Sequence, residues 1–430
     1  MNVASLYQIY LSHPVVTTDS RNIQTGSIFF ALKGDNFNGN EFAMTALAKG
    51  ASYAVVDEAC YATEERILLV EDVLTTLQGL ARLHRQSTGV PVLAITGTNG
   101  KTTTKELTAA VLSRKFNLVC TKGNLNNHIG VPLTLLSIRP ETDFAVVEMG
   151  ANHPGEIEAL CRIALPDFGL ITNVGRAHLE GFGSFEGVIQ TKSELYRFLE
   201  EKKGVIFINT SNPILTAKAG TVSKIGYTTA KSGEGLEGEL VSADPSLLFK
   251  ILFPKGWLYV KTKLVGGYNL ENALAAAAIG HYFGIDPTNI VAALESYQPD
   301  NNRSQMVVTD RNRLLMDAYN ANPSSTMAAL ENFAHLKSTK KGVILGDMLE
   351  LGADAPEEHQ KMVDFLATLD LDLVLLTGSH YAGCKRPATF HCYNEPAELV
   401  AYLKETQLSE YLLLIKGSRG MKLETIRPEL

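Results

Sequence analysis

A short glycine-containing string between an apolar run and a polar run is the strongest constraint on the fold of this chain. The apolar residues 92–95 predict a buried strand, Gly97 and Gly100 bracket a turn, and a helix is expected from Lys101. Backbone N–H groups at such a turn, together with the positive end of the helix, form a cradle for phosphate oxygens. The Lys101 side chain would reach the terminal phosphates, and the Thr102 hydroxyl would bind Mg²⁺. The sequence therefore predicts a nucleotide triphosphate site in an α/β domain.

The string departs from the general phosphate-loop pattern at one position. That pattern has a glycine five residues before the Gly-Lys pair, where this chain has Ile95. A glycine-rich turn with a solvated lysine is the alternative interpretation, but the buried strand before the turn and the helix after it favour ATP or GTP. The predicted nucleotide-binding residues of the loop are Gly97, Thr98, Asn99, Gly100, Lys101, Thr102 and Thr103.

Length and composition are those of an ordinary globular protein. A chain of 430 residues suggests two to four domains, with 45% hydrophobic and 20% charged residues. A net charge of −7 argues against a nucleic-acid binder that relies on phosphate contacts. It leaves anionic substrates open, because the local placement of Lys and Arg decides their binding.

The termini and cysteines indicate a cytoplasmic protein. The N-terminus has no basic segment followed by an apolar one, and no apolar run approaches the ~20 residues that span a bilayer. The five cysteines are scattered and lack Cys-x-x-Cys spacing, which favours reduced thiols. Cys384 and Cys392 with His391 form a conceivable metal cluster, but unrelated packing positions explain them better.

Hydrophobic patterning divides the chain into three regions. The boundaries are expected at the Gly/Pro-containing string Ser87–Pro91 and near Gln298–Asn302. Buried-type runs alternate with helical stretches in the second and third regions, which is typical of parallel sheets in α/β domains. A more β-like stretch at 236–265 precedes an alanine-rich helix at 270–283, whose small side chains predict close helix packing.

Polar residues follow several predicted strands, at the edge where open α/β sheets bind ligands. Glu148 ends one strand and is placed to hold Mg²⁺ opposite Thr102. His178 follows the next strand as a ligand or acid/base, and Lys192 is expected on a helix. Each has a plainer alternative: Glu148 as a helix cap, His178 as a loop histidine and Lys192 as a surface lysine. With Lys101, these residues form the predicted catalytic set.

Six strings across nearly the whole chain occur together in a known family. They are Thr96-Gly-Thr-Asn-Gly-Lys-Thr-Thr103, Gly123-Asn-Leu-Asn-Asn-His-Ile-Gly-Val-Pro-Leu-Thr134, Glu148-Met-Gly-Ala-Asn-His-Pro-Gly-Glu156, Ile171-Thr-Asn-Val-Gly-Arg-Ala-His178, Tyr268-Asn-Leu-Glu-Asn-Ala273 and Lys416-Gly-Ser-Arg419. With them, the chain resembles the Mur ligases, which form amide bonds with ATP and build the cytoplasmic peptidoglycan precursor. Asp317-Ala-Tyr-Asn-Ala-Asn-Pro323 and Leu345-Gly-Asp-Met-Leu-Glu-Leu-Gly352 are similar to the members that add D-alanyl-D-alanine. The Asp-Asn-Pro-Arg string of the diaminopimelate-adding members is absent.

The resemblance implies an α/β architecture of three domains and a reaction. The domains are a small N-terminal UDP-substrate-binding domain (1–87), a central P-loop ATPase-like domain with a parallel sheet (88–299) and a C-terminal Rossmann-like domain (300–430). ATP would phosphorylate the terminal carboxylate of UDP-N-acetylmuramoyl-tripeptide, and the amine of D-alanyl-D-alanine would attack the acyl phosphate. A monomer with no nucleic-acid partner and no membrane insertion is expected.

The resemblance also implies site roles. Thr102 and Glu148 would hold one Mg²⁺, and His178 with a carbamylated Lys192 a second, although Thr191 and Ser193 replace the usual Ala and Gly. The nucleotide-side residues would be Asn269 and Asn272 at the adenine, Arg303 at a phosphate and Asp317 at the ribose. An interdomain salt bridge is the alternative for Arg303.

Substrate contacts are expected in the flanking regions. Ser20 and Arg21 resemble uracil and diphosphate contacts, although a helix N-cap at Asp19-Ser20 would explain this string as well. The usual Asp-Gly-His string appears as Asn38-Gly-Asn40. Asn320 and Asn322 are candidate acceptor or hinge contacts, or parts of a buried turn, and Lys416-Gly-Ser-Arg419 would approach the substrate carboxylate.

Two other functions are compatible with parts of the pattern. Another amino-acid-adding ligase, of the kind that includes folylpolyglutamate synthase, would share the ATP site. A P-loop ATPase switch would need the phosphate loop alone and would leave Glu148, His178 and Lys192 unexplained.

Overall fold

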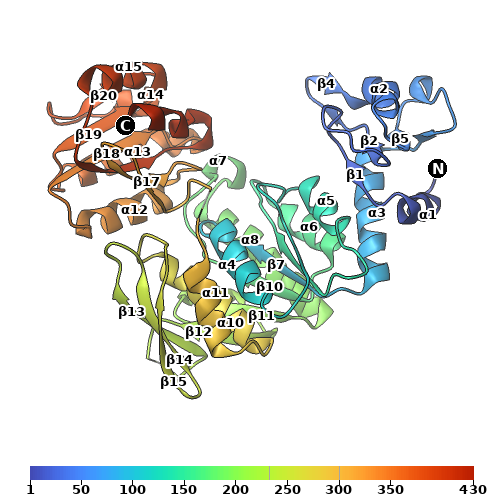
Figure 1. Ribbon diagram of the computed structural model, residues 1–430, viewed down its shortest axis with the longest axis horizontal. Helices are drawn as coiled ribbons and strands as arrows, with labels where there is room; N and C mark the ends of the chain where they lie inside the picture. The colour runs from blue at the N-terminus through green and yellow to red at the C-terminus, as the bar shows by residue number, and fades with distance from the viewer. Residues whose placement is uncertain (232, 300) are drawn as a thin grey trace.

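A computed structural model describes residues 1–231, 233–299 and 301–430. Its strands form three main sheets, which follow one another along the chain (Figure 1). We call the segments that carry them the N-terminal part, the central part and the C-terminal part. In Figure 1 the N-terminal part (blue) and the C-terminal part (orange to red) stand apart above the central part. The predicted boundary string Gln298–Asn302 contains residue 300, which lies outside the described residues.

The N-terminal part has a four-stranded parallel sheet of order β1-β2-β5-β6 and a small antiparallel pair, β3-β4. The strands are β1 (Val16–Thr17), β2 (Ile28–Phe30), β3 (Lys33–Gly34), β4 (Phe37–Asn38), β5 (Tyr53–Val56) and β6 (Ile67–Leu69). The helices are α1 (Val3–Ser12), η1 (Gly39–Phe42), α2 (Ala43–Ala48), η2 (Ala59–Tyr61) and α3 (Val73–Thr88). No helix begins at Asp19-Ser20, so the N-cap interpretation of that string is wrong. Asp19 instead accepts a hydrogen bond from the Arg21 backbone N–H in a short turn.

The central part is built on a nine-stranded sheet of order β15-β14-β13-β12-β11-β10-β7-β9-β8. Pairing is parallel from β8 through β13 and antiparallel from β13 to β15. Its strands are β7 (Val92–Thr96), β8 (Leu118–Cys120), β9 (Phe144–Glu148), β10 (Phe168–Ile171), β11 (Val205–Asn209), β12 (Ser223–Thr228), β13 (Leu236–Ser242), β14 (Leu248–Phe253) and β15 (Gly256–Lys261). Every residue of β7 and β9 is buried, as expected for strands covered by helices on both faces.

The helices of the central part cover this sheet. They are α4 (Lys101–Leu112), α5 (Gly130–Leu135), α6 (Glu156–Ala164), α7 (Leu179–Phe182), α8 (Phe185–Lys202), α9 (Pro213–Lys218), α10 (Asn269–Tyr282) and α11 (Pro287–Ser296). The alanine-rich helix α10 packs closely on α4: a Cβ added at Gly280 would lie 2.3 Å from Val111 Cγ1. The close packing predicted from the alanines is therefore confirmed.

The C-terminal part holds a six-stranded sheet of order β16-β17-β21-β18-β19-β20, parallel except at the β16 edge. The strands are β16 (Gln305–Val308), β17 (Arg313–Asp317), β18 (Lys340–Gly346), β19 (Leu373–Thr377), β20 (His391–Tyr393) and β21 (Tyr411–Lys416). The helices are α12 (Pro323–His335), η3 (Gly352–Asp354), α13 (Ala355–Leu366), α14 (Ser379–Ala382), α15 (Pro396–Thr406), η4 (Arg419–Met421) and η5 (Leu423–Glu429). The three-part α/β architecture expected from the sequence is thus confirmed.

Strand order brings the predicted site residues to two facing sheet edges. In the central sheet β7 lies between β9 and β10, which pairs Ile95 with Glu148 and Thr96 with Ile171. In the C-terminal sheet, Asp317 at the end of β17 pairs with Lys416 at the end of β21. Ligand-binding residues of open α/β sheets gather at such carboxyl ends.

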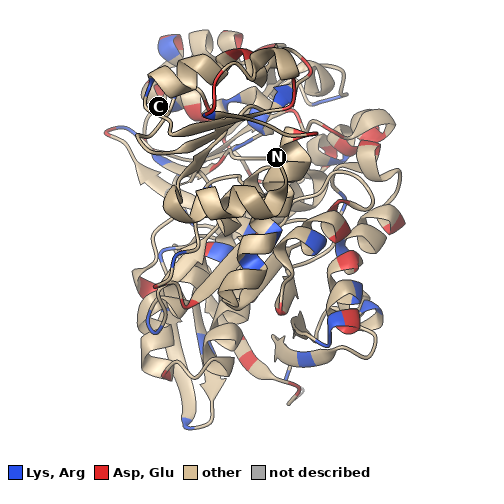
Figure 2. Ribbon diagram, turned by 90° about the vertical axis from the view of Figure 1, so that its right-hand side faces the viewer, with Lys and Arg blue, Asp and Glu red and all other residues tan. Residues whose placement is uncertain are grey.

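Basic and acidic residues are interspersed along the ribbon in Figure 2. Among the described residues, every helix is too short or too polar to cross a bilayer.

Candidate active site

The phosphate loop between β7 and α4 depends on its two glycines. Gly97 and Gly100 have φ values of 144° and 76°. A Cβ at Gly97 would lie 2.0 Å from Thr172 Oγ1, and one at Gly100 would lie 2.4 Å from Asn272 Oδ1. Both positions therefore require glycine, because a side chain would meet both strain and a neighbour.

The segment after β10 holds the loop in place and leaves the start of α4 open. The N–H groups of Thr98 and Asn99 donate to the backbone O and the side-chain Oδ1 of Asn173, both at 2.9 Å. Gly100, the N-cap residue of α4, has no side chain of its own, and no other described side chain caps the helix there. The first N–H groups of this helix are therefore free to receive an anion such as a phosphate.

Lys101 is folded back on its own loop. Its Nζ donates to the carbonyl oxygens of Gly97 at 2.7 Å and Thr98 at 2.8 Å. Burial lowers the pKa of Lys101 to about 8, with Glu148 opposing this shift and Arg303 adding to it. An anionic phosphate at the loop would favour the protonated lysine.

Glu148 and Thr102 form a group suited to a cation. The Glu148 side chain is 1% exposed, and its Oε1 accepts from Thr102 Oγ1 at 3.2 Å and from Asn126 Nδ2 at 2.8 Å. Its Oε2 is buried with no hydrogen-bond partner among the described residues. A buried, unpaired carboxylate oxygen beside a hydroxyl is what a bound Mg²⁺ would satisfy. The helix-cap interpretation of Glu148 fails, because it ends β9.

His178 precedes α7 in a left-handed backbone conformation with φ 51°. Its buried Nδ1 lies 2.5 Å from Oε2 of Glu350 in the C-terminal part, although the geometry is not that of a directed hydrogen bond. The contact with His178 lowers the pKa of the Glu350 carboxyl.

Lys192 is buried on α8, so the surface-lysine interpretation is wrong. Its Nζ lies 3.3 Å from the Ala151 carbonyl oxygen and 5.3 Å from the centre of the Phe182 ring. Burial, and secondarily the charge of Lys101, hold the pKa of Lys192 well below its usual value. A neutral amine is the form that can react with CO₂ to give a carbamate.

The two asparagines predicted near adenine lie together at the start of α10. Asn272 Nδ2 donates to Asn269 Oδ1 at 3.0 Å, and Asn269 Nδ2 donates to the Val265 carbonyl oxygen at 2.9 Å. Asn272 Oδ1 also accepts from Thr104 Oγ1 on α4 at 3.0 Å. The pair thus belongs to the same packed unit as the phosphate loop.

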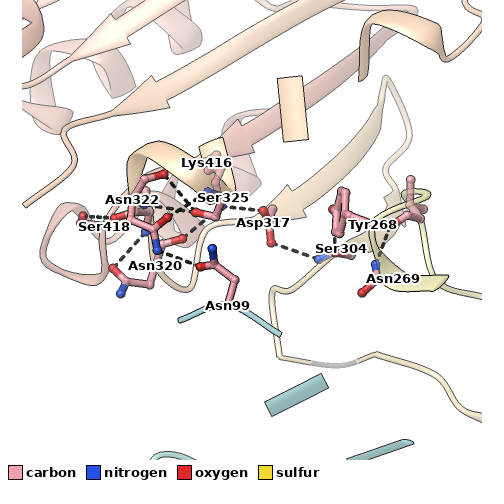
Figure 3. Close-up of polar contacts among 12 residues, drawn as sticks. Asn99, Tyr268, Asn269, Ser304, Asp317, Asn320, Asn322, Ser325, Lys416 and Ser418 are labelled. Atoms are coloured by element: carbon pink, nitrogen blue, oxygen red, sulfur yellow. Dashed lines mark hydrogen bonds and ion pairs between the residues drawn. The ribbon is translucent and has the colours of Figure 1, made fainter. Parts of the chain in front are cut away.

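The C-terminal part contributes charged groups around Tyr319. The Arg303 guanidinium lies 3.8 Å from the centre of the Tyr319 ring, and its Nε is buried without a hydrogen-bond partner among the described residues. Among the described residues, Arg303 takes part in none of the ion pairs. Asp317 accepts from Lys416 Nζ at 2.6 Å and from the Ser304 N–H at 3.3 Å (Figure 3).

Asn320 and Asn322 have structural roles as well as places in the site. Asn322 caps α12 by accepting from the Ser325 N–H at 2.8 Å, and its Nδ2 donates to Asn99 Oδ1 of the phosphate loop at 2.8 Å (Figure 3). The Asn320 backbone oxygen accepts from Lys416 Nζ at 3.1 Å. Asn322 is buried at the start of a helix whereas Asn320 is exposed, so the buried-turn interpretation fits Asn322 alone. The acceptor and hinge interpretations stay predictions.

These groups surround one cavity of about 830 Å³ between the central and C-terminal parts. The predicted residues that line it are Thr98, Asn99, Gly100, Lys101, Thr103, Glu148, His178, Asn269, Asn272, Arg303, Asp317, Asn320 and Asn322. Gly97, Thr102 and Lys192 do not line it. Sequence reasoning did not assign site roles to Asn126 and Tyr319, although both stand in the strings that carried the family resemblance.

The predicted UDP contacts lie far from this cavity along the chain and do not line it. Arg21 forms an exposed ion pair with Asp19 at 2.9 Å, and Lys49 Nζ donates to the Ser20 carbonyl oxygen. Asn40, where the histidine of the usual string would stand, is buried and exchanges hydrogen bonds with Asp57 at 2.9 and 3.0 Å.

Protein side chains alone do not make a complete metal centre here. In residues 1–231, 233–299 and 301–430, no three His, Cys, Asp or Glu side chains gather in a way that could hold an ion. This includes Cys384, Cys392 and His391, and all five cysteines are free. Mg²⁺ commonly takes hydroxyl, water and phosphate oxygens beside one or two carboxylates, so the Glu148–Thr102 group still fits it.

Three family models match successive segments of the chain. The model described as Mur ligase family, catalytic domain, matches residues 14–85, the Mur ligase middle domain matches 95–280, and the Mur ligase glutamate ligase domain matches 302–419. Together they cover most of the three parts described above.

Similar proteins and structures extend over the full length. UDP-N-acetylmuramoyl-tripeptide–D-alanyl-D-alanine ligase of Bacillus subtilis is 34% identical, with 100% of this chain and 97% of that protein aligned. A crystal structure of MurF from Acinetobacter baumannii has a TM-score of 0.87 at 30% identity, covering 100% of this chain and 98% of that one. MurF of Thermotoga maritima, solved in complex with ADP, has a TM-score of 0.85 at 26% identity, with 97% of each chain covered. The chain belongs to the Mur ligase family.

Proposed function

We propose that this chain is an ATP-dependent ligase that adds D-alanyl-D-alanine to UDP-N-acetylmuramoyl-tripeptide in peptidoglycan precursor synthesis. The activity is that named for the full-length relatives. The observation that carries it here is the cavity in which the phosphate loop faces Arg303, Asp317 and Lys416. Such a site can hold a triphosphate and a second, carboxylate-bearing substrate together. ATP binding is also supported by the relative solved with ADP.

The nucleotide would bind along the central edge of the cavity. Its phosphates would receive hydrogen bonds from the open N–H groups of α4 and from Lys101, once that side chain leaves the loop carbonyls. The unpaired Nε of Arg303 gives a further donor. Asn269 and Asn272 would contact adenine, and Asp317 the ribose.

Mg²⁺ would bind beside Glu148 and Thr102, and by resemblance to the family a second Mg²⁺ would bind with His178 and Lys192. The ion supplies positive charge that offsets the negative charge of the phosphoryl group in transfer. Lys192 would join the second position as a carbamate, because its neutral amine can take up CO₂ with loss of a proton.

The reaction needs positioning more than covalent chemistry from the protein. A carboxylate oxygen of the tripeptide attacks the γ-phosphorus of ATP and releases ADP, giving an acyl phosphate. The free amine of D-alanyl-D-alanine then attacks the acyl carbon, and phosphate and a proton leave as the amide forms. Asn320, Asn322 and Arg419 lie on the C-terminal side, where the acceptor would approach, whereas Ser20 and Arg21 would hold the UDP end.

The organisation of the chain is part of the proposal. We place domain boundaries near residues 88 and 300, with a cytoplasmic monomer as the working form.

A panel of acceptors tests the proposed function. Purified protein with ATP and UDP-N-acetylmuramoyl-tripeptide should release phosphate when D-alanyl-D-alanine is added, but not when glutamate or diaminopimelate is added. Release with glutamate instead would favour a folylpolyglutamate synthase-like ligase. ATP hydrolysis that is indifferent to the UDP-substrate would favour an ATPase switch.

Carbamylation of Lys192 has its own test. Lys192→Ala should lose activity and regain part of it with added short carboxylates, and undiminished activity would exclude the modification as a requirement.

A further inference from the structure

One close contact joins the C-terminal part to a residue assigned to the reaction. Glu350 Oε2 lies 2.5 Å from His178 Nδ1. Glu350 belongs to the segment after β18, and His178 belongs to the segment after β10, so this contact joins two separate sheets. The proposed reaction scheme gives Glu350 no role.

Both residues of the contact have an uncommon backbone conformation. His178 has φ 51° and Glu350 has φ 66°, both in the left-handed region. Non-glycine residues hold this conformation at a cost, and they do so where the surrounding structure determines it. The two segments are therefore shaped to bring these side chains together.

Neighbouring contacts seat the same segments against each other. Arg176 NH1 lies 3.5 Å from Oε1 of the buried Glu358, and the Arg176 N–H donates to Ser324 Oγ at 3.1 Å. A Cβ added at Gly352 would lie 3.3 Å from Cβ of Glu180. Residues 175–180 thus rest on the C-terminal part along their length.

We propose that Glu350 is a positioning residue for His178. Histidines that bind metals commonly present one ring nitrogen to the metal and the other to a carboxylate, which fixes the ring. Here the carboxylate comes from a different sheet, so His178 is oriented only when the C-terminal part is docked. This inference deepens the proposed function, since it assumes that His178 faces Mg²⁺.

The test compares three variants. Glu350→Ala removes the contact, and Glu350→Gln keeps the side-chain shape and an acceptor oxygen without the charge. The matched control is Asp354→Asn, which removes an exposed carboxylate from the adjoining η3. Melting temperatures establish that each variant is folded. If Glu350→Ala does not fold, the measurements are made on Glu350→Gln instead.

Two readouts do not depend on turnover. Mn²⁺ binding, followed by paramagnetic resonance with a non-hydrolysable ATP analogue, should be weakened about 10- to 100-fold at one class of site in Glu350→Ala. The effect should be smaller in Glu350→Gln and absent in Asp354→Asn. The second readout uses ligand-free protein labelled with ¹⁵N-histidine, in which the His178 ring signals are assigned by their loss in His178→Asn. These signals should shift in Glu350→Ala and stay unchanged in Asp354→Asn.

The outcomes separate this inference from the proposed function. Unchanged Mn²⁺ binding in folded Glu350 variants, or unshifted His178 signals, would overturn the positioning role. Failure of D-alanyl-D-alanine ligation by the unmodified protein, with the His178 shift still present, would overturn the function and leave the contact standing.

Discussion

The joint between the N-terminal and central parts is built around a shared apolar core, whereas the contacts between the central and C-terminal parts are mainly polar. The first shares one hydrophobic cluster, which runs from Leu6 and Leu80 through Leu135 to Val222. Helix α3 contributes to it and packs against both α1 and α5. Contacts across the second joint include the hydrogen bonds of Asn322 with Asn99 and of the Arg176 backbone N–H with Ser324. They also include the Arg176–Glu358 ion pair and the His178–Glu350 contact. Among the described residues before position 300, Val265 alone belongs to the main apolar cluster of the C-terminal part.

The difference indicates which joint can open. Separating a shared apolar core costs roughly 25 cal/mol of free energy for each Å² of apolar surface that becomes exposed to water. The first joint therefore resists opening. A hydrogen bond exchanged for water costs about 1 kcal/mol net, and an ion pair whose two members become hydrated costs a similar amount. The second joint is therefore the one suited to admit substrates and close over them.

The largest effect is expected from removing a charge at the polar joint. Lys101→Ala should lower the ligation rate by on the order of 10²–10³-fold, because a preorganised cation at the transferred phosphoryl group is lost. Phosphate release at saturating substrates measures it, and the melting temperature should stay close to that of the unmodified protein. A small loss of rate would mean that the polar joint is not where the chemistry occurs.

A core change at the apolar joint should have the opposite pattern. Leu80→Ala, at a fully buried position, should lower the free energy of unfolding by about 2–5 kcal/mol. Leu11→Ala on α1, where the side chain is 54% exposed, is the control and should have little effect. Denaturant unfolding measures both. Equal effects of the two substitutions would contradict a core shared across this joint.

Nucleotide affinity should depend on pH through Lys101. Its pKa is about 8 without ligand, and phosphate charge raises it, so binding takes up a proton above pH 8. ATP affinity should then fall by up to about tenfold per pH unit until the pKa of the bound form is passed. Calorimetry in buffers of different ionisation enthalpy measures the uptake.

Lys101→Arg is the control for this pH dependence. A guanidinium stays protonated throughout the range, so proton uptake near pH 8 should vanish even if some affinity remains. Persistent uptake in this variant would assign the titration to another group.

The smallest effect is expected from one hydrogen bond across the polar joint. Asn322→Ser keeps a residue that can cap α12, but the serine side chain is too short to reach Asn99. The free energy of docking between the C-terminal and central parts should therefore weaken by about 0.5–1.5 kcal/mol. Small-angle scattering should show a larger mean radius of gyration without ligands, and contraction with ATP and the UDP-substrate. Glu331→Gln, exposed on the same helix, should behave as the unmodified protein. A radius that ligands leave unchanged would count against closure.

The local structure of the site was predictable where one segment determines it. Apolar runs located β7 and β9, and glycine spacing located the turn before α4. The strand Val205–Asn209 lies on a similar apolar run, so the signal was present although the strand was not predicted. Short edge strands such as His391–Tyr393 lack a run of this kind and gain their structure from pairing with a neighbour.

Contacts between distant segments were not predictable from the sequence alone. The stacking of Arg303 on Tyr319 and the Glu350–His178 contact depend on how two sheets face each other. The same holds for Asn322, whose position at a helix start explains the residue without its contact to Asn99. Family resemblance identified the strings that carry these residues, but only the packing shows which of them meet.

The folded-back lysine of the phosphate loop changes the meaning of a binding measurement. Lys101 already donates hydrogen bonds to two carbonyl oxygens of the loop. At Lys101 a nucleotide therefore does not fill a vacant donor; it displaces the two loop carbonyl groups, which must find water or another partner. The heat of binding is accordingly the difference between two sets of hydrogen bonds, and a weak enthalpy would be compatible with a well-formed site.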